Sequence, residues 1–414
     1  MKKFFYFFLT GLIAAFILFL RNPQFLLHAQ FWAEDGHVWF AQAYNFGWFR
    51  PLFWAQDGYF QTVSRLAADI ALLFPIVKAP LVINIFTVIL QIIPVLFLAS
   101  DRLSEIIPNR LVRLFIALGF LFLPNSSEIR GSLTYVQWFL ALSAFLVIVA
   151  NLPNSKFKKV FDSLILFLCG VSGPYIVFLV PVSFIIWWRN RRPYRLYIFL
   201  LTILGAAIQS VALFILSSRG QVHLFSAMSP KLFMAILNRQ VFMGSIIGQS
   251  GYLWILNNIS WYFWLFLITT ALSLVLVSWS IYKGNMALRL FLLFGFLIFS
   301  ISLMNSTANA AQDMPAWKVL SRSIDGVRYW FLPMLAFFVS VVWNVRIKNP
   351  LLIRIIAGVY LIAFLWGAIG DFKSPMLTDY KFSNYSENFS NLPSGRTLKI
   401  PINPPGWEME LVKK

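Results

Sequence analysis

The sequence predicts an all-α polytopic membrane protein, and three observations lead to this fold class. Of 414 residues, 59% are hydrophobic and only 12% are charged, far from the composition of a soluble domain. The mean hydropathy is +0.75. Apolar stretches of about 20 residues, the length that crosses a bilayer as a helix, recur along the chain. This composition excludes a soluble enzyme and a disordered chain, and the single cysteine, Cys169, excludes a disulfide-stapled domain.

The first expected span follows directly from the start of the chain. Met1, Lys2 and Lys3 precede an apolar run from Phe4 to Leu20, and no small-residue cleavage site follows this run. We therefore interpret it as an uncleaved helix whose basic start stays in the cytoplasm. The same length test predicts ten further spans. The eleven helices are expected at 4–20, 80–99, 112–124, 132–150, 161–171, 174–188, 195–216, 259–281, 287–304, 329–345 and 351–369.

The distribution of charge gives the expected orientation, because cytoplasmic loops are enriched in Lys and Arg. With the N-terminus cytoplasmic and the C-terminus extracytoplasmic, the inner loops hold 17 basic and three acidic residues, and the outer loops hold 17 basic and 12 acidic ones. Membrane topology thus accounts for the net charge of +19, and no nucleic-acid partner is expected. We interpret 62–78 as an interfacial or re-entrant helix, since counting it as a span would invert every later loop.

The spans define two parts of the chain. A transmembrane domain covers 1–369, and its extracytoplasmic first loop, 21–79, is expected to bear interfacial helices. An extracytoplasmic tail, 370–414, is too short for a core of its own. We expect it to pack over the outer loops, with Trp407 as an anchor. The helix breaker between the short spans 161–171 and 174–188 predicts a cavity that opens outward, because exposed backbone is tolerated in the membrane only beside protein or water.

An acidic pair in the first loop is the leading candidate for chemistry. Glu34 and Asp35 adjoin between Trp32 and Trp39, and neighbouring carboxylates beside apolar rings raise each other's pKa. Such a pair suits a general base or a cation site. The alternative is an Asp-Gly turn that caps the following helix. We expect Asp35 to be the base, because Gly36 lets a substrate approach the backbone, and Glu34 to support it.

Further polar clusters lie at the predicted outer face. Glu128 and Arg130 form either a surface pair or the mouth of a cavity. The loop 217–258 and the segment before span 329–345 are basic, against the positive-inside trend. Phosphate recognition by Arg and Lys explains such loops, and snorkelling to ordinary headgroups is the alternative. The candidate substrate-binding residues are His37, Arg50, Asp57, Tyr59, Arg65, Glu128, Arg130, Tyr135, His223, Arg239, Arg328 and Tyr329.

The cytoplasmic start, the long aromatic first outer loop with Glu34 and Asp35, and the many spans with basic outer loops resemble the bacterial membrane glycosyltransferases of the GT-C superfamily. The resemblance implies a first-loop carboxylate, Asp35 or Glu34, as general base. It also implies a polyprenyl-phosphate-linked sugar donor, Arg328 as a ligand of the donor phosphate, and a glycan or lipid-linked acceptor. The expected location is the bacterial inner membrane, with the active site on the extracytoplasmic side. The large C-terminal domain of some members is absent, which leaves the acceptor class open.

Other functions are also compatible with these sequence features. A lipid-linked glycan polymerase or ligase also uses outer arginines. A polyprenyl-lipid flippase or transporter needs a polar path, for which the spans offer little beyond Gln91 and Gln209. A non-catalytic scaffold is a further alternative. The sequence has no nucleotide or structural zinc motif. Two adjacent acids could bind a divalent metal, but no third ligand can be assigned, so no cofactor is assigned.

Overall fold

The chain is a mostly helical membrane protein. The computed structural model describes residues 2–216, 229–304, 316–322 and 326–414. Within these ranges, six helices are long and apolar enough to cross a membrane, and three shorter helices are also apolar. The six are Ile76–Ala99, Pro193–Leu216, Tyr262–Lys283, Met286–Met304, Val327–Asn344 and Leu351–Gly370, and the three are Phe5–Arg21, Leu133–Val149 and Ile176–Asn190.

A helix lies at each of the eleven positions that the sequence predicts. Five of these helices (α6, α8, α9, α10 and α18) have 13 to 15 residues and are therefore about 20 to 22 Å long, shorter than the ~30 Å hydrocarbon core. The helices are α1 (Lys2–Arg21), α5 (Ala79–Ala99), α6 (Arg110–Phe122), α8 (Val136–Val149), α9 (Lys156–Gly170), α10 (Ile176–Asn190), α11 (Pro193–Val211), α15 (Tyr262–Lys283), α16 (Met286–Met304), α18 (Phe331–Asn344) and α19 (Leu351–Gly370).

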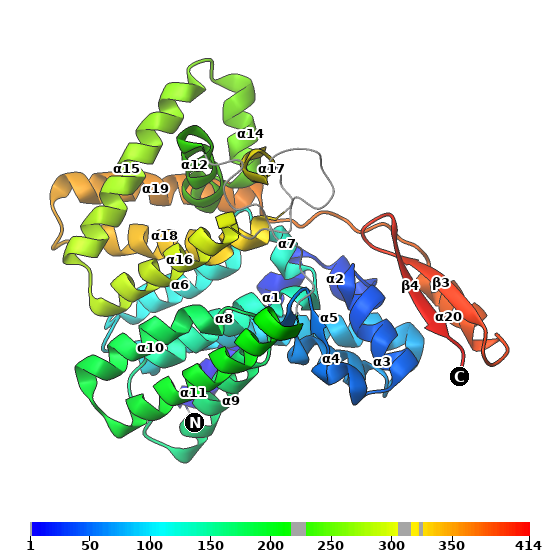
Figure 1. The fold of residues 1–414 in the computed structure, drawn as a ribbon. Coiled ribbons are helices and arrows are strands. Elements are labelled where there is room, and N and C mark those ends of the chain that lie inside the picture. The colour runs from blue at the N-terminus through cyan, green and yellow to red at the C-terminus, as the bar shows by residue number, and fades with distance from the viewer. Residues whose placement is uncertain (1, 217–228, 305–315, 323–325) are drawn as a thin grey trace.

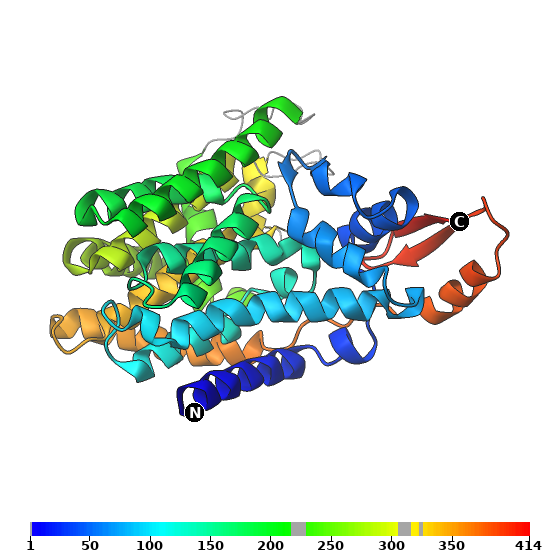
Figure 2. The same cartoon turned by 90° about the horizontal axis from the view of Figure 1, so that it is seen from below.

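The helices lie side by side as a bundle with two different ends (Figures 1 and 2). The N-terminus is at one end, and the first loop and the C-terminal segment are at the other. We call the end with the N-terminus the basic end, because the connections there adjoin most of the basic residues that the sequence assigns to the cytoplasm. These connections are 100–109, 150–155, 191–192, 284–285 and 345–350. The opposite end is called the loop end.

Basic residues at the basic end also hold the helices together. Arg102 donates to both carboxylate oxygens of Asp162 at 3.1 and 2.8 Å, and the Tyr194 hydroxyl donates to the same carboxylate at 2.8 Å. Arg195 donates to the carbonyls of Ile148 and Ala150, both at 2.6 Å. The last carbonyls of a helix have no partner within it, so Arg195 satisfies the end of α8.

The first loop is folded into short elements at the loop end. A hairpin turns at Asp57 and Gly58, whose φ angles of +53° and +83° fit the type I′ turn that Asp-Gly favours. The helix α4 has ten residues, about 15 Å, which is half of the hydrocarbon core. A crossing by α4 alone is therefore excluded. The elements are α2 (Gln24–Leu27), η1 (Asp35–Phe40), α3 (Ala41–Phe46), η2 (Arg50–Phe53), β1 (Ala55–Gln56), β2 (Tyr59–Phe60), α4 (Thr62–Ala71) and η3 (Ile76–Lys78).

The C-terminal segment packs on the first loop. It consists of α20 (Phe382–Ser390) and the antiparallel hairpin of β3 (Thr397–Ile402) and β4 (Trp407–Val412). Asn403 accepts a hydrogen bond from the Ala33 N–H and donates its own to the Phe31 carbonyl at 3.2 Å. The Trp407 ring contacts the His37 ring edge-to-face, with centroids 5.5 Å apart. The hairpin thus covers the stretch of the first loop that contains the acidic pair.

The segment 217–258, expected to be a loop, is helical over its described residues, so this expectation is wrong for 230–258. It forms α12 (Pro230–Ile236), the π-helical η7 (Leu237–Met243), α13 (Gly244–Ile246) and α14 (Gly248–Asn258). A distant carboxylate explains the start of α14: Asp371 accepts from the N–H groups of Gln249 and Ser250 at 2.8 and 3.0 Å. The first N–H groups of a helix need such an acceptor, which no local residue supplies here.

The helix breaker between α9 and α10 pairs with backbone groups of the first loop. Thr62 donates its N–H to the Val171 carbonyl at 3.1 Å, and Gly173 donates to the Phe60 carbonyl at 2.8 Å. The Gln209 amide donates to Phe60 as well, at 3.3 Å. Backbone at membrane depth requires such partners. In this part of the structure, protein rather than water therefore supplies them.

Helices α9 and α11 cross where glycine faces glycine. A Cβ atom added to Gly205 would lie 2.8 Å from the Cα of Gly170, closer than real Cβ contacts. We predict that Gly205→Ala lowers the free energy of unfolding by roughly 1–3 kcal/mol, the usual cost of overpacking. Thermal or denaturant unfolding in detergent measures this change. Gly358→Ala is the matched control, because a Cβ there meets nothing within 4 Å. Equal effects of both changes would show that this crossing is not tightly packed.

Candidate functional site

Three distant segments of the chain meet at the loop end. They are the turn before η1, the segment of α7 (Ser127–Arg130) and η5 (Leu133–Tyr135), and η8 (Val327–Trp330), which leads into α18. Their polar side chains form what we call the acid–arginine cluster: Glu34, Asp35, Glu128, Tyr135 and Arg328. The cluster contains both members of the acidic pair and three of the predicted substrate-binding residues.

Asp35 is buried and fully engaged by the segment before α8. Its Oδ1 accepts from the Ser132 hydroxyl at 2.9 Å and from the N–H and hydroxyl of Thr134, both at 3.1 Å. Its Oδ2 accepts from the Leu133 N–H at 2.9 Å. The side chain is 1% exposed. Burial raises the pKa of Asp35 to about 7, and the hydrogen bonds from Leu133 and Ser132 act in the opposite direction. Asp35 therefore attaches the first loop to the bundle.

Glu34 faces a different environment from its neighbour. Its Oε2 is buried and has no hydrogen-bond partner among the described residues. Burial raises the pKa of Glu34, and the positive charge of Arg328 opposes this shift. A carboxylate that is partly desolvated and unpaired at one oxygen holds a proton more tightly than an exposed one, and a nearby cation reduces this effect without cancelling it here. The geometry therefore favours Glu34 over Asp35 as the reactive carboxylate, the reverse of the expectation from sequence.

Arg328 is held in place by Glu128. The two side chains form an ion pair, and the Arg328 backbone N–H donates to the second carboxylate oxygen at 2.9 Å. Their side chains are 22% and 18% exposed, so the pair is neither buried nor fully solvated. The guanidinium carbon lies 5.7 Å from the Tyr135 ring and 4.9 Å from the Tyr329 ring. Two aromatic faces and one carboxylate thus fix the position of this charge.

Three first-loop candidates lie around the cluster. The Tyr59 hydroxyl accepts a hydrogen bond from Gln137 at 3.3 Å. Asp57 is exposed at the hairpin turn, and its charge acts on Glu34. His37 is also exposed, and its Nδ1 lies 2.6 Å from the Glu408 carbonyl oxygen. The charges of Asp57 and His37 both act on Glu34, and His37 also joins the first loop to the C-terminal hairpin.

The remaining candidates have other partners or lie apart. Arg130 is buried and donates to Ser126, Gln91 and the Phe120 carbonyl, so it supports the fold rather than the mouth of a cavity. Arg65 is buried over the Trp39 ring and donates to Gln42 at 2.7 Å.

Arg50 and Arg239 also make no contact with the cluster. Arg50 is exposed in η2. Arg239 donates to the Ser321 carbonyl at 3.0 Å and stacks on Tyr252; among the described residues it has no hydrogen bond or ion pair to the acid–arginine cluster. His223 lies outside the described residues.

Sequence reasoning missed the residues that organise the cluster. Ser132 and Thr134 hold Asp35, and Asn403 holds the backbone before the acidic pair. Ser and Thr before a helix commonly bond nearby backbone groups, which is the only local signal here. Nothing local links them to a carboxylate almost 100 residues away.

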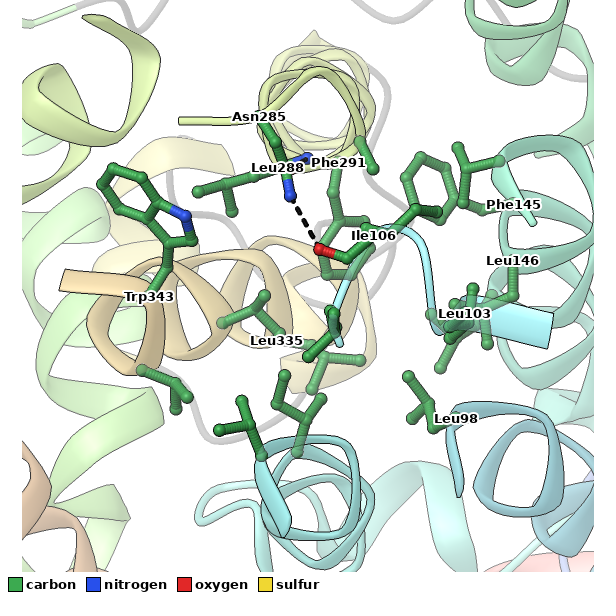
Figure 3. A pocket seen from close by; sticks show the side chains of 18 of the residues that line it. Leu98, Leu103, Ile106, Phe145, Leu146, Asn285, Leu288, Phe291, Leu335 and Trp343 are labelled. Atoms are coloured by element: carbon green, nitrogen blue, oxygen red, sulfur yellow. Dashed lines mark hydrogen bonds between the residues drawn. The ribbon is translucent and has the colours of Figure 1, made fainter. Parts of the chain in front are cut away.

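A separate apolar cavity lies at the basic end (Figure 3). It has a volume of about 70 Å³ and is lined by apolar side chains from α5, α6, α8, α16 and α18. Of its lining residues, only Asn285 and Arg346 carry an amide or a charge, and Asn285 donates to the Ile106 carbonyl at 3.0 Å. This cavity therefore offers few hydrogen-bond partners to a polar ligand.

The described residues include no group of three or more His, Cys, Asp or Glu side chains that could hold a metal ion. No protein-family model and no curated protein matches the chain.

The different environments of the two acids lead to a prediction for stability. Asp35→Asn replaces one acceptor oxygen by an N–H₂ group that faces other donors. A buried mismatch of this kind costs about 1–3 kcal/mol, so we expect a lower unfolding temperature in detergent. Glu34→Gln is the matched control, and it should stay within about 0.5 kcal/mol of the parent protein because its Oε2 makes no hydrogen bond. Similar losses in the two variants would contradict the structural role of Asp35.

Proposed function

We propose that this protein is a membrane glycosyltransferase that moves a sugar from a polyprenyl-phosphate-linked donor to an extracytoplasmic glycan or lipid-linked acceptor. Glu34 is the general base of this reaction. One observation carries the proposal: a half-buried carboxylate with an unpartnered oxygen lies beside an arginine that a second carboxylate holds in place. Sugar transfer from a lipid phosphate needs such a pair of opposite charges at the membrane surface.

The base role follows from the position of Glu34. Its carboxylate takes the proton of the acceptor hydroxyl as the hydroxyl oxygen attacks the anomeric carbon. Burial raises its pKa, which increases its affinity for that proton, while Arg328 keeps a fraction of it ionised. Activity should therefore fall on acidification with a midpoint above the ordinary value for a glutamate.

The role of Arg328 follows from the leaving group. As the bond between the sugar and the lipid phosphate breaks, negative charge develops on the phosphate. A fixed cation stabilises this charge without reorganising during the reaction. Glu128 and the two tyrosine rings hold the guanidinium in one position, as such a role requires.

The proposed topology has eleven spans, with the N-terminus in the cytoplasm and the C-terminus outside. It is supported by the positive-inside distribution and by the two chain ends, which lie at opposite ends of the bundle (Figure 1). The basic end is then cytoplasmic, and the acid–arginine cluster is extracytoplasmic, in the bacterial inner membrane. A lipid-linked sugar presents its anomeric carbon at that surface.

Transport of a polyprenyl lipid is less well supported. The two polar side chains available for a path, Gln91 and Gln209, are both used inside the protein. Gln91 exchanges hydrogen bonds with Arg130, and Gln209 bonds Phe60 and the Gly170 carbonyl. A polymerase or ligase acting on lipid-linked glycans would share the chemistry proposed for Glu34 and Arg328.

The catalytic proposal predicts a specific loss of turnover. Glu34→Gln should reduce release of polyprenyl phosphate from its sugar conjugate by about two to four orders of magnitude, because a general base contributes that much. Release is measured with purified protein and a panel of polyprenyl-phosphate hexoses and pentoses. Glu105→Gln, an exposed acid at the basic end, is the control and should be fully active. Normal turnover of Glu34→Gln, or no turnover of any donor by the parent protein, would contradict the proposal.

The topology predicts which added cysteines react from outside the cell. Ser394, in the C-terminal segment, and Asn190, at the basic end, are both exposed. Ser394→Cys should react with an impermeant maleimide on intact cells, and Asn190→Cys only after the membrane is opened. The parent protein is the control, because its one cysteine, Cys169, is buried. The opposite pattern would invert the topology.

A further inference from the structure

A groove runs between α9 and α11 at the basic end of the bundle. Both helices begin at this end and lie side by side (Figure 1). The groove has a volume of about 530 Å³ and opens away from the protein. It is distinct from the acid–arginine cluster, which lies at the loop end.

The groove is polar at one end and apolar along its length. Lys159 lies in the first turn of α9 and is exposed. Val160, Leu164 and Phe167 continue along the same face of the helix and are 65%, 50% and 53% exposed. Phe167 lies eight positions after Lys159, a distance of about 12 Å along the helix axis. This length is close to the depth of one leaflet, half of the ~30 Å hydrocarbon core.

The polar end carries positive charge. Lys156 and Lys158 flank Lys159 along α9, and Arg192 immediately precedes α11. Asp162, an acid on α9, points into the bundle, where Arg102 and Tyr194 bind it. The residues that line the groove include no acid. The groove therefore attracts an anion.

Two hydroxyl groups lie next to Lys159. The Ser163 hydroxyl donates to the Lys159 carbonyl at 2.8 Å. Its single proton is used in that bond, so the Tyr197 hydroxyl is the donor in the 2.8 Å contact between Tyr197 and Ser163. Both hydroxyl protons are therefore bonded within the protein, and the Lys159 ammonium is the donor left for a phosphate oxygen.

We propose that this groove binds an anionic phospholipid from the leaflet at the basic end. The phosphate lies beside Lys159, and one acyl chain lies along Val160, Leu164 and Phe167. Basic pockets between membrane helices commonly bind lipid headgroups in this way. The site is independent of the proposed sugar transfer.

Native mass spectrometry of the detergent-solubilised protein tests the proposal. The probes are phosphatidylglycerol and phosphatidylcholine with identical acyl chains. The parent protein should retain more phosphatidylglycerol than phosphatidylcholine. Lys159→Gln should reduce bound phosphatidylglycerol about fivefold, the factor that one Lys contributes near anionic lipid.

Two further variants make the result specific. Lys348→Gln removes an exposed charge at the same end but outside the groove, so phosphatidylglycerol binding should not change. Leu164→Trp fills the groove and should reduce binding of both lipids. Unfolding temperatures without lipid check that all variants are folded, as expected for exposed positions. Equal losses in Lys348→Gln and Lys159→Gln, or no preference for phosphatidylglycerol in the parent protein, would overturn the proposal.

Discussion

The arrangement of the loop end depends on the four hydrogen bonds that Asp35 accepts from residues 132–134. A buried carboxylate is costly unless its lone pairs are satisfied, so this contact has one acceptable geometry. It attaches the first loop to the start of α8. With the first loop attached in this way, Glu34 lies near Arg328, and the C-terminal hairpin packs on the first loop. The position of Glu34 relative to Arg328 therefore depends on the burial of Asp35.

The helical part of the fold was predictable because it follows from local physics. Length and hydropathy placed α19 at 351–369, and the structure has it at Leu351–Gly370. The helices between 230 and 258 were not predictable in this way. They are short, and α14 begins where Asp371 accepts its first N–H groups. A helix start that depends on a side chain more than 100 residues away leaves no pattern in its own sequence.

The candidate site was predictable in its membership but not in its roles. Glu34, Asp35, Glu128 and Arg328 all follow from the expected outer face, and the structure brings them together. Which acid is buried depends on Ser132 and Thr134, and the partner of Arg328 depends on packing between α7 and η8. Two adjacent acids such as Glu34 and Asp35 cannot be ranked as candidate general bases without knowing which side chain faces the bundle.

The contact between Asn403 and the Phe31 and Ala33 backbone has a consequence for biosynthesis. It joins residues 31 and 33 to residue 403, so it cannot form until the ribosome has translated the chain past residue 403. The contact therefore forms after the helices between these residues have been synthesised, and until then this part of the first loop lacks its C-terminal partner. A chain that stops short of the hairpin would keep its membrane helices yet lack the cover over Glu34. Translation past residue 403 is thus required before this cover can form.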